Sequence, residues 1–124
     1  MGGSSTQTEE IIAGLPTQFL LSSYENGALL VVTQLGKLGT LVEANAHVTL
    51  DGKVSSFSTR PLLCDRGEGA EALARVLCEE GCIKSRSRRL ILALALVDGD
   101  PSPNTFRAIL DVVGRLWDTI EPKG

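Results

Sequence analysis

Two short segments of the sequence are apolar at almost every position, and they constrain the fold more than any other feature. Ala28–Leu35 and Leu90–Val97 are rich in leucine, valine and alanine and show no regular alternation of polar residues. Strands of this kind are buried on both faces, whereas a strand with one face in water alternates apolar and polar residues. The sequence therefore predicts a sheet that is covered on both sides.

Length and composition set the class of protein. A chain of 124 residues is long enough for one domain with a single core. Hydrophobic residues make up 43% of the sequence, which excludes an intrinsically disordered protein. The formal net charge is -3, so the chain as a whole does not attract nucleic acid or anionic membranes. We expect neither as a partner.

The cysteines indicate a reducing compartment. Cys64, Cys78 and Cys82 are odd in number and lack the pattern of a disulfide framework. The first residues are small and polar, unlike a secretory signal, and no apolar run reaches the ~18 residues of a membrane span. The expected location is the cytoplasm, with the nucleus as an alternative.

The order of strand and helix signals predicts an α+β domain. Strands are predicted at Glu9–Tyr24, at Ala28–Leu35, from Thr40, at Val54–Leu63 and at Leu90–Val97. Helices are predicted at Ala70–Glu80 and from Pro103 to Ile120. The order β-β-β-β-α-β-α predicts an antiparallel sheet of about five to six strands with two main α-helices. Residues 1–8 are expected to be a flexible start, 9–120 the domain, and 121–124 a tail.

Glycines mark the expected connections between the first strands. Glu25-Asn26-Gly27 is a turn signal, and Gly36-Lys37-Leu38-Gly39 is expected to close a hairpin between Ala28–Leu35 and Thr40–Val42. The polar stretch Glu43–Gly52 then predicts a loop.

The last helix has the clearest signal in the chain. Ser102 is a favourable N-cap and Pro103 suits the first helical position. Apolar residues then recur with helical spacing at Phe106, Ile109, Leu110, Val113, Leu116, Trp117 and Ile120. Two helices can cover one face of a five-stranded sheet, but not easily both. We therefore expect a second chain on the other face, unless Glu43–Val54 or the N-terminal segment folds over it.

The sequence offers no convincing catalytic, cofactor or metal site. Cys78 and Cys82 lie four residues apart, but zinc needs four ligands and His47 is remote in sequence. Gly36-x-x-Gly39 with Lys37 only superficially resembles a phosphate loop, because a strand follows it instead of a helix. The chain is not expected to be an enzyme or to hold a cofactor.

Three motifs in the first third of the chain can be matched to a family. Gly14-Leu-Pro-Thr-Gln18, Leu29-Leu-Val-Val-Thr-Gln34 and Gly36-Lys-Leu-Gly-Thr-Leu-Val42 occur in the order and spacing of the proteasome assembly chaperone 3 family, which this chain resembles. From Pro61 to Trp117 only the pattern of elements agrees. The resemblance implies a small α+β protein that acts as a homodimer or with a partner of similar fold, proteasome assembly chaperone 4. It further implies binding to α subunits during assembly of the 20S core particle, without catalysis or nucleotide.

Two groups of residues are candidates for contact with proteasome subunits. The first comprises the predicted hairpin tip and the polar loop that follows: Lys37, His47, Val48, Leu50, Asp51 and Lys53. The second is the basic segment after the first helix, with Arg86, Arg88 and Arg89. That segment equally suits a nuclear signal, a phosphorylation target or a solvated loop before a buried strand.

Other functions fit the same sequence features. A dimeric scaffold module of the roadblock or longin kind, serving trafficking or signalling complexes, shares the size and the lack of catalytic groups. A small thiol enzyme would require a cysteine of low pKa. The start Met1-Gly-Gly-Ser-Ser-Thr6 loosely fits the N-myristoylation pattern, and it equally fits a plain flexible segment.

Overall fold

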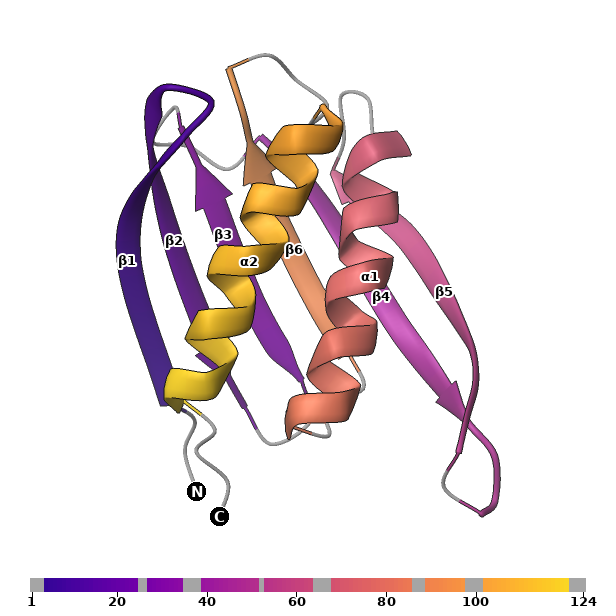
Figure 1. The fold of residues 1–124 in the computed structure, drawn as a ribbon. Coiled ribbons are helices and arrows are strands. Elements are labelled where there is room, and N and C mark those ends of the chain that lie inside the picture. Colours follow the sequence, from indigo (N-terminus) through magenta and orange to yellow (C-terminus); the bar gives the residue numbers. More distant parts are fainter. Residues whose placement is uncertain are drawn as a thin grey trace.

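One six-stranded sheet and two helices make up the fold (Figure 1). The computed structural model describes residues 4–24, 27–34, 39–51, 53–63, 68–85, 89–97 and 102–120. The elements in chain order are β1 (Ser4–Ile12), β2 (Leu15–Ser23), β3 (Ala28–Thr33), β4 (Thr40–Val48), β5 (Val54–Leu63), α1 (Glu68–Ser85), β6 (Arg89–Ala95) and α2 (Pro103–Ile120). The predicted α+β class is confirmed.

The strand order β1-β2-β3-β6-β4-β5 places β6 between β3 and β4. The β3–β6 pair is parallel and the other pairs are antiparallel, so the sheet is mixed. The predicted hairpin between Ala28–Leu35 and Thr40–Val42 is therefore wrong. The long apolar run of β6 takes the central position, since such strands are favoured where both faces are covered.

Gly39 fits this arrangement for a different reason from the one the sequence suggested. Its φ is +63°, and a Cβ atom added there would lie 2.6 Å from the carbonyl oxygen of Leu94 on β6. Only glycine allows the chain to enter β4 so close to the β6 backbone. The glycine therefore serves a close approach between neighbouring strands and not a tight hairpin.

The N-terminal region forms two strands where the sequence predicted one. Ser4–Thr8, expected to be flexible, belong to β1, which pairs with β2 along its whole length. The strands are joined at Ala13 and Gly14, whose φ values of 55° and 78° are typical of a tight hairpin turn. The polar composition of residues 4–8 suits a strand at the edge of a sheet, where one side meets solvent.

The polar stretch predicted as a loop is mostly strand. β4 continues to Val48, so only the short turn around Thr49–Lys53 connects it to β5; the Thr49 amide donates to the Lys53 carbonyl at 2.8 Å. β5 has the predicted bounds, and α1 is longer than predicted at both ends. α2 begins at Pro103 as predicted, and the Ser102 hydroxyl caps it by accepting a hydrogen bond from the Thr105 amide at 3.2 Å.

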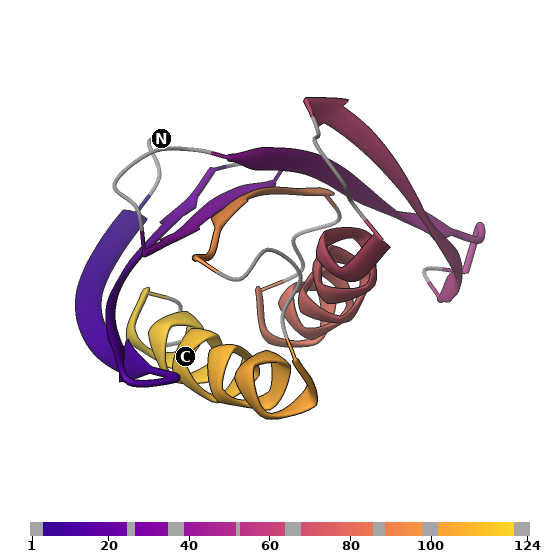
Figure 2. The same ribbon diagram turned by 90° about the horizontal axis from the view of Figure 1, so that it is seen from above.

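Both helices lie against the same face of the curved sheet (Figure 2). The core forms between them and that face, which we call the inner face. Its largest fully buried side chains include Phe19, Leu30, Leu73, Leu92, Ile109 and Trp117. The apolar stripe of α2 predicted from the sequence faces this core.

The opposite face of the sheet, which we call the outer face, has no described element over it (Figure 2). β1 lies at one edge of the sheet, and the segment 43–54 forms the β4–β5 hairpin at the other edge. Neither folds over the outer face, so the intrachain cover considered above is not found in the described parts of the chain. None of the described helices is long and apolar enough to cross a membrane.

The close approach at Gly39 gives a test of the strand order. Gly39→Ala combines a positive φ with a clash against β6, whereas Gly14→Ala has the positive φ but no atom within 4 Å. We expect the control Gly14→Ala to lower the free energy of unfolding by about 1–2 kcal/mol. Gly39→Ala adds an overpacking cost of about 1–3 kcal/mol. Equal losses in urea unfolding would contradict the placement of β6 beside Gly39.

Candidate protein-binding face

The centre of the outer face is an apolar patch built from four neighbouring strands. Val31 of β3 pairs with Leu20 of β2 on one side and with Ala93 of β6 on the other, and Ala93 in turn pairs with Leu41 of β4. The adjacent row holds Leu29 and Ile91. All of these side chains except that of Ala93 are partly exposed. Contiguous exposed apolar surface of this kind is typical of protein interaction sites.

A charged cluster borders the apolar patch. Glu43 of β4 lies between Ile91 of β6 and Arg60 of β5 in the sheet register. Its carboxylate accepts a hydrogen bond from Arg60 Nη2 at 2.6 Å and from Arg89 Nε at 2.5 Å. Only 7% of the Glu43 side chain is exposed, while the arginine side chains are 69% and 51% exposed. The two arginines therefore shield the carboxylate and present the cluster's net positive charge to solvent.

The arginines control the ionisation of Glu43. Burial alone raises the pKa of a carboxyl group, but here it is outweighed by hydrogen bonds from Arg60 and Arg89 and by their charges. The pKa of Glu43 is therefore lowered below its usual value of 4.5. The carboxylate is ionised at neutral pH, and it holds both guanidinium groups against the outer face.

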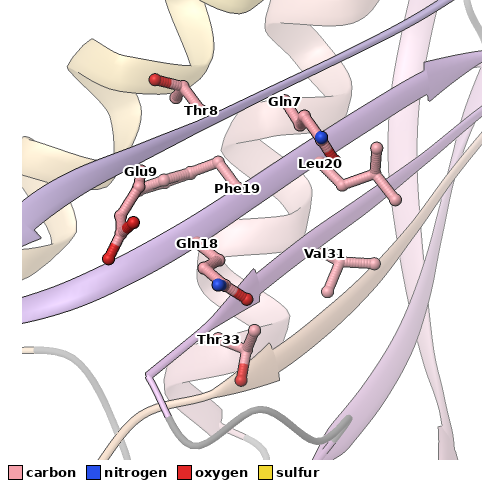
Figure 3. Close-up of a pocket in the computed structure, with 8 residues that line it drawn as sticks. All are labelled: Gln7, Thr8, Glu9, Gln18, Phe19, Leu20, Val31 and Thr33. Atoms are coloured by element: carbon pink, nitrogen blue, oxygen red, sulfur yellow. The ribbon is translucent and has the colours of Figure 1, made fainter.

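A shallow hollow of about 470 Å³ lies at the diagonally opposite corner of the outer face, where β1, β2 and β3 meet (Figure 3). Leu20 and Val31 form its apolar part, and Gln7, Gln18 and Thr33 supply polar groups. Glu9 of β1 adds a carboxylate at the edge. The neighbouring Glu10 points to the inner face, where it lies 3.8 Å from Arg115 of α2. The hollow suits a long side chain with an apolar stem and a cationic end.

The predicted contact residues of the polar stretch gather at the β4–β5 hairpin. The Leu50 side chain is fully exposed, and Lys53 is exposed beside it. A hydrogen bond from Thr49 and one from the Lys53 amide lower the pKa of Asp51. The hydroxyl and amide therefore stabilise the charged form of Asp51 and rigidify the turn.

The remaining described candidates lie away from the hairpin tip. His47 lies on β4, where its Nε2 atom is 2.9 Å from Ser58 Oγ of β5, and Val48 ends the same strand. Arg89 lies in the cluster with Glu43 and not at the hairpin tip. Lys37, Arg86 and Arg88 lie outside the described residues. The proposed contact role of all these residues stays a prediction.

Sequence reasoning missed the charged cluster and the hollow. Glu43 was assigned to a loop, although its period-two spacing from Leu41 and Asn45 matches a strand face. Arg60 and Glu9 come from the two edge strands, which are distant in sequence. The cluster depends on pairings between β4, β5 and β6 that no local motif signals.

The described residues contain no group of three or more histidine, cysteine or carboxylate side chains arranged to hold a metal ion. Cys78 is buried on α1, and its thiol lies 3.7 Å from the Ala44 carbonyl oxygen of β4. Cys64 lies outside the described residues, as does the side chain of Cys82. Cys78 therefore packs in the core as a small apolar residue.

The lowered pKa of Glu43 predicts a pH-dependent contribution to stability. Because the folded-state pKa lies below the unfolded-state value, the contribution is present at neutral pH and is lost as pH falls below about 4.5 through the folded pKa. Glu43→Gln should lower the free energy of unfolding at pH 7 by about 1 kcal/mol, since the arginines are largely in water. The difference from wild type should shrink in acid. A constant difference from pH 7 to pH 3, or an effect equal to that of Glu79→Gln on the exposed face of α1, would contradict this role.

Comparison with known proteins gives the same family as the sequence motifs. The family model described as "Proteasome assembly chaperone 3" matches residues 30–115. This range includes most of the sheet and both helices down to Arg115. It leaves out the motif at residues 14–18 and extends well beyond the other two motifs, which end at Val42.

Individual relatives extend the match to most of the chain. Proteasome assembly chaperone 3 of Mus musculus is 31% identical over 110 residues, covering 88% of each protein, and that of Bos taurus is 32% identical over 111 residues, covering 89% of each. The fold is similar to a chain in the crystal structure titled "a Novel Chaperone Complex for Yeast 20S Proteasome Assembly", with a TM-score of 0.67 at 11% identity, covering 92% of this chain and 98% of that one. The chain therefore belongs to the proteasome assembly chaperone 3 family.

Proposed function

We propose that this protein is a non-enzymatic chaperone that binds α subunits of the 20S core particle and promotes assembly of the α ring. In this proposal it works as a dimer, either with a second copy or with a partner similar to proteasome assembly chaperone 4. Membership of the family supports the role in proteasome assembly. The observation that carries the dimer is the partly exposed apolar patch on the outer face, centred on Val31 and Ala93.

The physical argument for a dimer is that one layer of the fold is missing. The outer face carries leucine, isoleucine and valine side chains that are only partly shielded from water. Burying a side chain of this size contributes about 1.5–3 kcal/mol. A second sheet stacked on the outer face supplies that burial, as in sheet-on-sheet packing. The two-helix layer would then lie on the outside of each subunit.

The β4–β5 hairpin is the proposed contact with α subunits. It extends beyond the neighbouring strands at one end of the sheet (Figure 1). Its tip exposes an apolar side chain, Leu50, close in sequence to the charged residues Asp51 and Lys53. The tip lies at the margin of the outer face, so a dimer partner leaves it accessible. Lys37, Arg86 and Arg88 are further contact candidates from the sequence.

Two further parts of the proposal follow from the sequence and the family. We propose a location in the cytoplasm or nucleus, on the basis of the cysteine pattern. We also propose that no catalysis is involved. Cys78, a candidate thiol nucleophile, is buried against the inner face, whereas His47 lies on an exposed part of the sheet. A pull-down from cells that recovers proteasome α subunits supports the chaperone, whereas recovery of GTPases or coat components supports the scaffold module.

Replacing Val31 with aspartate tests the dimer interface. The variant places a charge at the centre of the apolar patch but leaves the inner core intact. We expect the dimer to dissociate at micromolar concentration in sedimentation velocity, because an unpaired charge is costly to bury. The matched control is Val76→Asp on the exposed surface of α1. This variant should remain dimeric. A Val31→Asp protein that associates as tightly as wild type would reject the outer face as the interface.

Truncating Leu50 tests the hairpin tip. Leu50→Ala should weaken binding to purified α subunits about tenfold, if Leu50 fills an apolar pocket at the interface. The dimer itself should be unaffected, since the tip lies outside the apolar patch. Val97→Ala is the control, because Val97 is an exposed apolar residue beyond the opposite end of the sheet. Equal affinities of the two variants for α subunits, measured by biolayer interferometry, would exclude this contact.

A further inference from the structure

The outer face carries opposite charges at diagonally opposite corners. At one corner the cluster of Glu43, Arg60 and Arg89 has a net positive charge and exposed guanidinium groups. At the other corner Glu9 supplies a negative charge beside the hollow formed with Gln18, Leu20 and Val31 (Figure 3). The apolar patch lies between the two corners.

The register of the sheet shows that the two corners lie on opposite sides of its centre, at the same displacement along the strands but in opposite directions. Val31 and Ala93 pair on β3 and β6, the two middle strands. Glu9 lies on the edge strand β1, in the row of Thr33, two residues beyond Val31. Arg60 lies on the other edge strand, β5, in the row of Ile91, two residues before Ala93. Because β3 and β6 are parallel, these displacements run in opposite directions.

A two-fold axis can exchange such positions. When two identical faces stack, the axis lies in the plane between them and relates each patch to itself. Viewed along the normal to the sheet, an axis through the Val31–Ala93 centre, perpendicular to the line from Glu9 to Arg60, brings each of these corners over the other corner of the second copy. A contact between Glu9 of one copy and Arg60 of the other would then form twice in the dimer.

We propose that a second copy of this chain docks on the outer face with the Arg60 side chain of each copy in the Glu9 hollow of the other. The inference rests on the proposed dimerisation through the outer face and adds its orientation. The hollow matches the ligand in chemistry, because Leu20 and Val31 contact the aliphatic stem of an arginine while Glu9 and Gln18 accept hydrogen bonds from its guanidinium group. Glu43 uses one Nη2 hydrogen of Arg60, so further donors remain for the partner.

The structure also explains why Arg60 is ready for this contact. Glu43 holds the guanidinium group at the surface, so less side-chain freedom is lost when the second copy binds. A charge pair across the interface also fixes the relative rotation of the two sheets, which an apolar patch alone specifies weakly. Arg60 is therefore proposed as a residue that orients the dimer.

Two charge reversals test the pairing in the full-length chain. Glu9→Arg and Arg60→Glu should each weaken self-association about tenfold when studied alone, because two like-charged pairs then face each other. In an equimolar mixture, the heterodimer contains one copy of each variant. At one corner the arginine introduced at position 9 meets the glutamate introduced at position 60, and at the other corner the native Glu9 and Arg60 meet. Native mass spectrometry of the mixture should therefore show the heterodimer in clear excess over the statistical ratio. A statistical ratio, or single variants that associate like wild type, would overturn the proposed pairing.

Matched variants separate this inference from the proposed function. Arg75→Glu and Glu79→Arg introduce the same charge changes on the exposed surface of α1 and should leave self-association unchanged. Thermal unfolding by circular dichroism checks that each variant is folded. Another outcome is a monomeric wild-type protein that binds a different partner, with Val31→Asp abolishing that binding. This result would reject a second copy as the occupant and would keep the outer face as the docking surface. If Val31→Asp has no effect on any association, the proposed dimer interface itself is rejected.

Discussion

The fold depends on one imbalance: the sheet has two apolar faces, and the two described helices both cover the same one (Figure 2). The inner face is filled by side chains from α1 and α2, and Trp117 and Leu73 are fully buried there. The outer face keeps a patch of leucine, isoleucine and valine residues that are only partly shielded. This imbalance is the basis of the proposed dimer, because a short chain can form a stable core and still bury more apolar surface against a partner.

The sequence predicted the elements better than their pairing. α2 begins and ends at the predicted residues, because capping and helical periodicity are local signals. β5 also has the predicted bounds. The predicted hairpin after β3 was wrong, because the insertion of β6 depends on contacts between segments about sixty residues apart in sequence. The first half of β1, residues 4–8, was missed because an edge strand tolerates the polar residues that usually indicate a loop.

The candidate site shows the same division. The apolar character of β3 and β6 predicted a sheet with two apolar faces, and the outer-face residues Leu29, Val31 and Ile91 are partly exposed. Leu50 is exposed in the stretch whose contact role stays a prediction. The Glu43 cluster was not predictable from local patterns, since Arg60 and Arg89 reach the carboxylate from two different strands. Its lowered pKa follows from that pairing. The cluster adds direction to a surface whose apolar part is non-directional.

Hydroxyl-radical footprinting of the outer face tests the central claim most directly. The reactivity of Leu29, Val31 and Ile91 is compared between a dilute, dissociated sample and the complex purified from cells, with exposed Val76 on α1 as the internal reference. The account predicts strong protection of the three outer-face residues in the complex and unchanged reactivity of Val76. Equal reactivity of the outer-face residues in both samples would show that no partner completes the sheet, and would contradict the account.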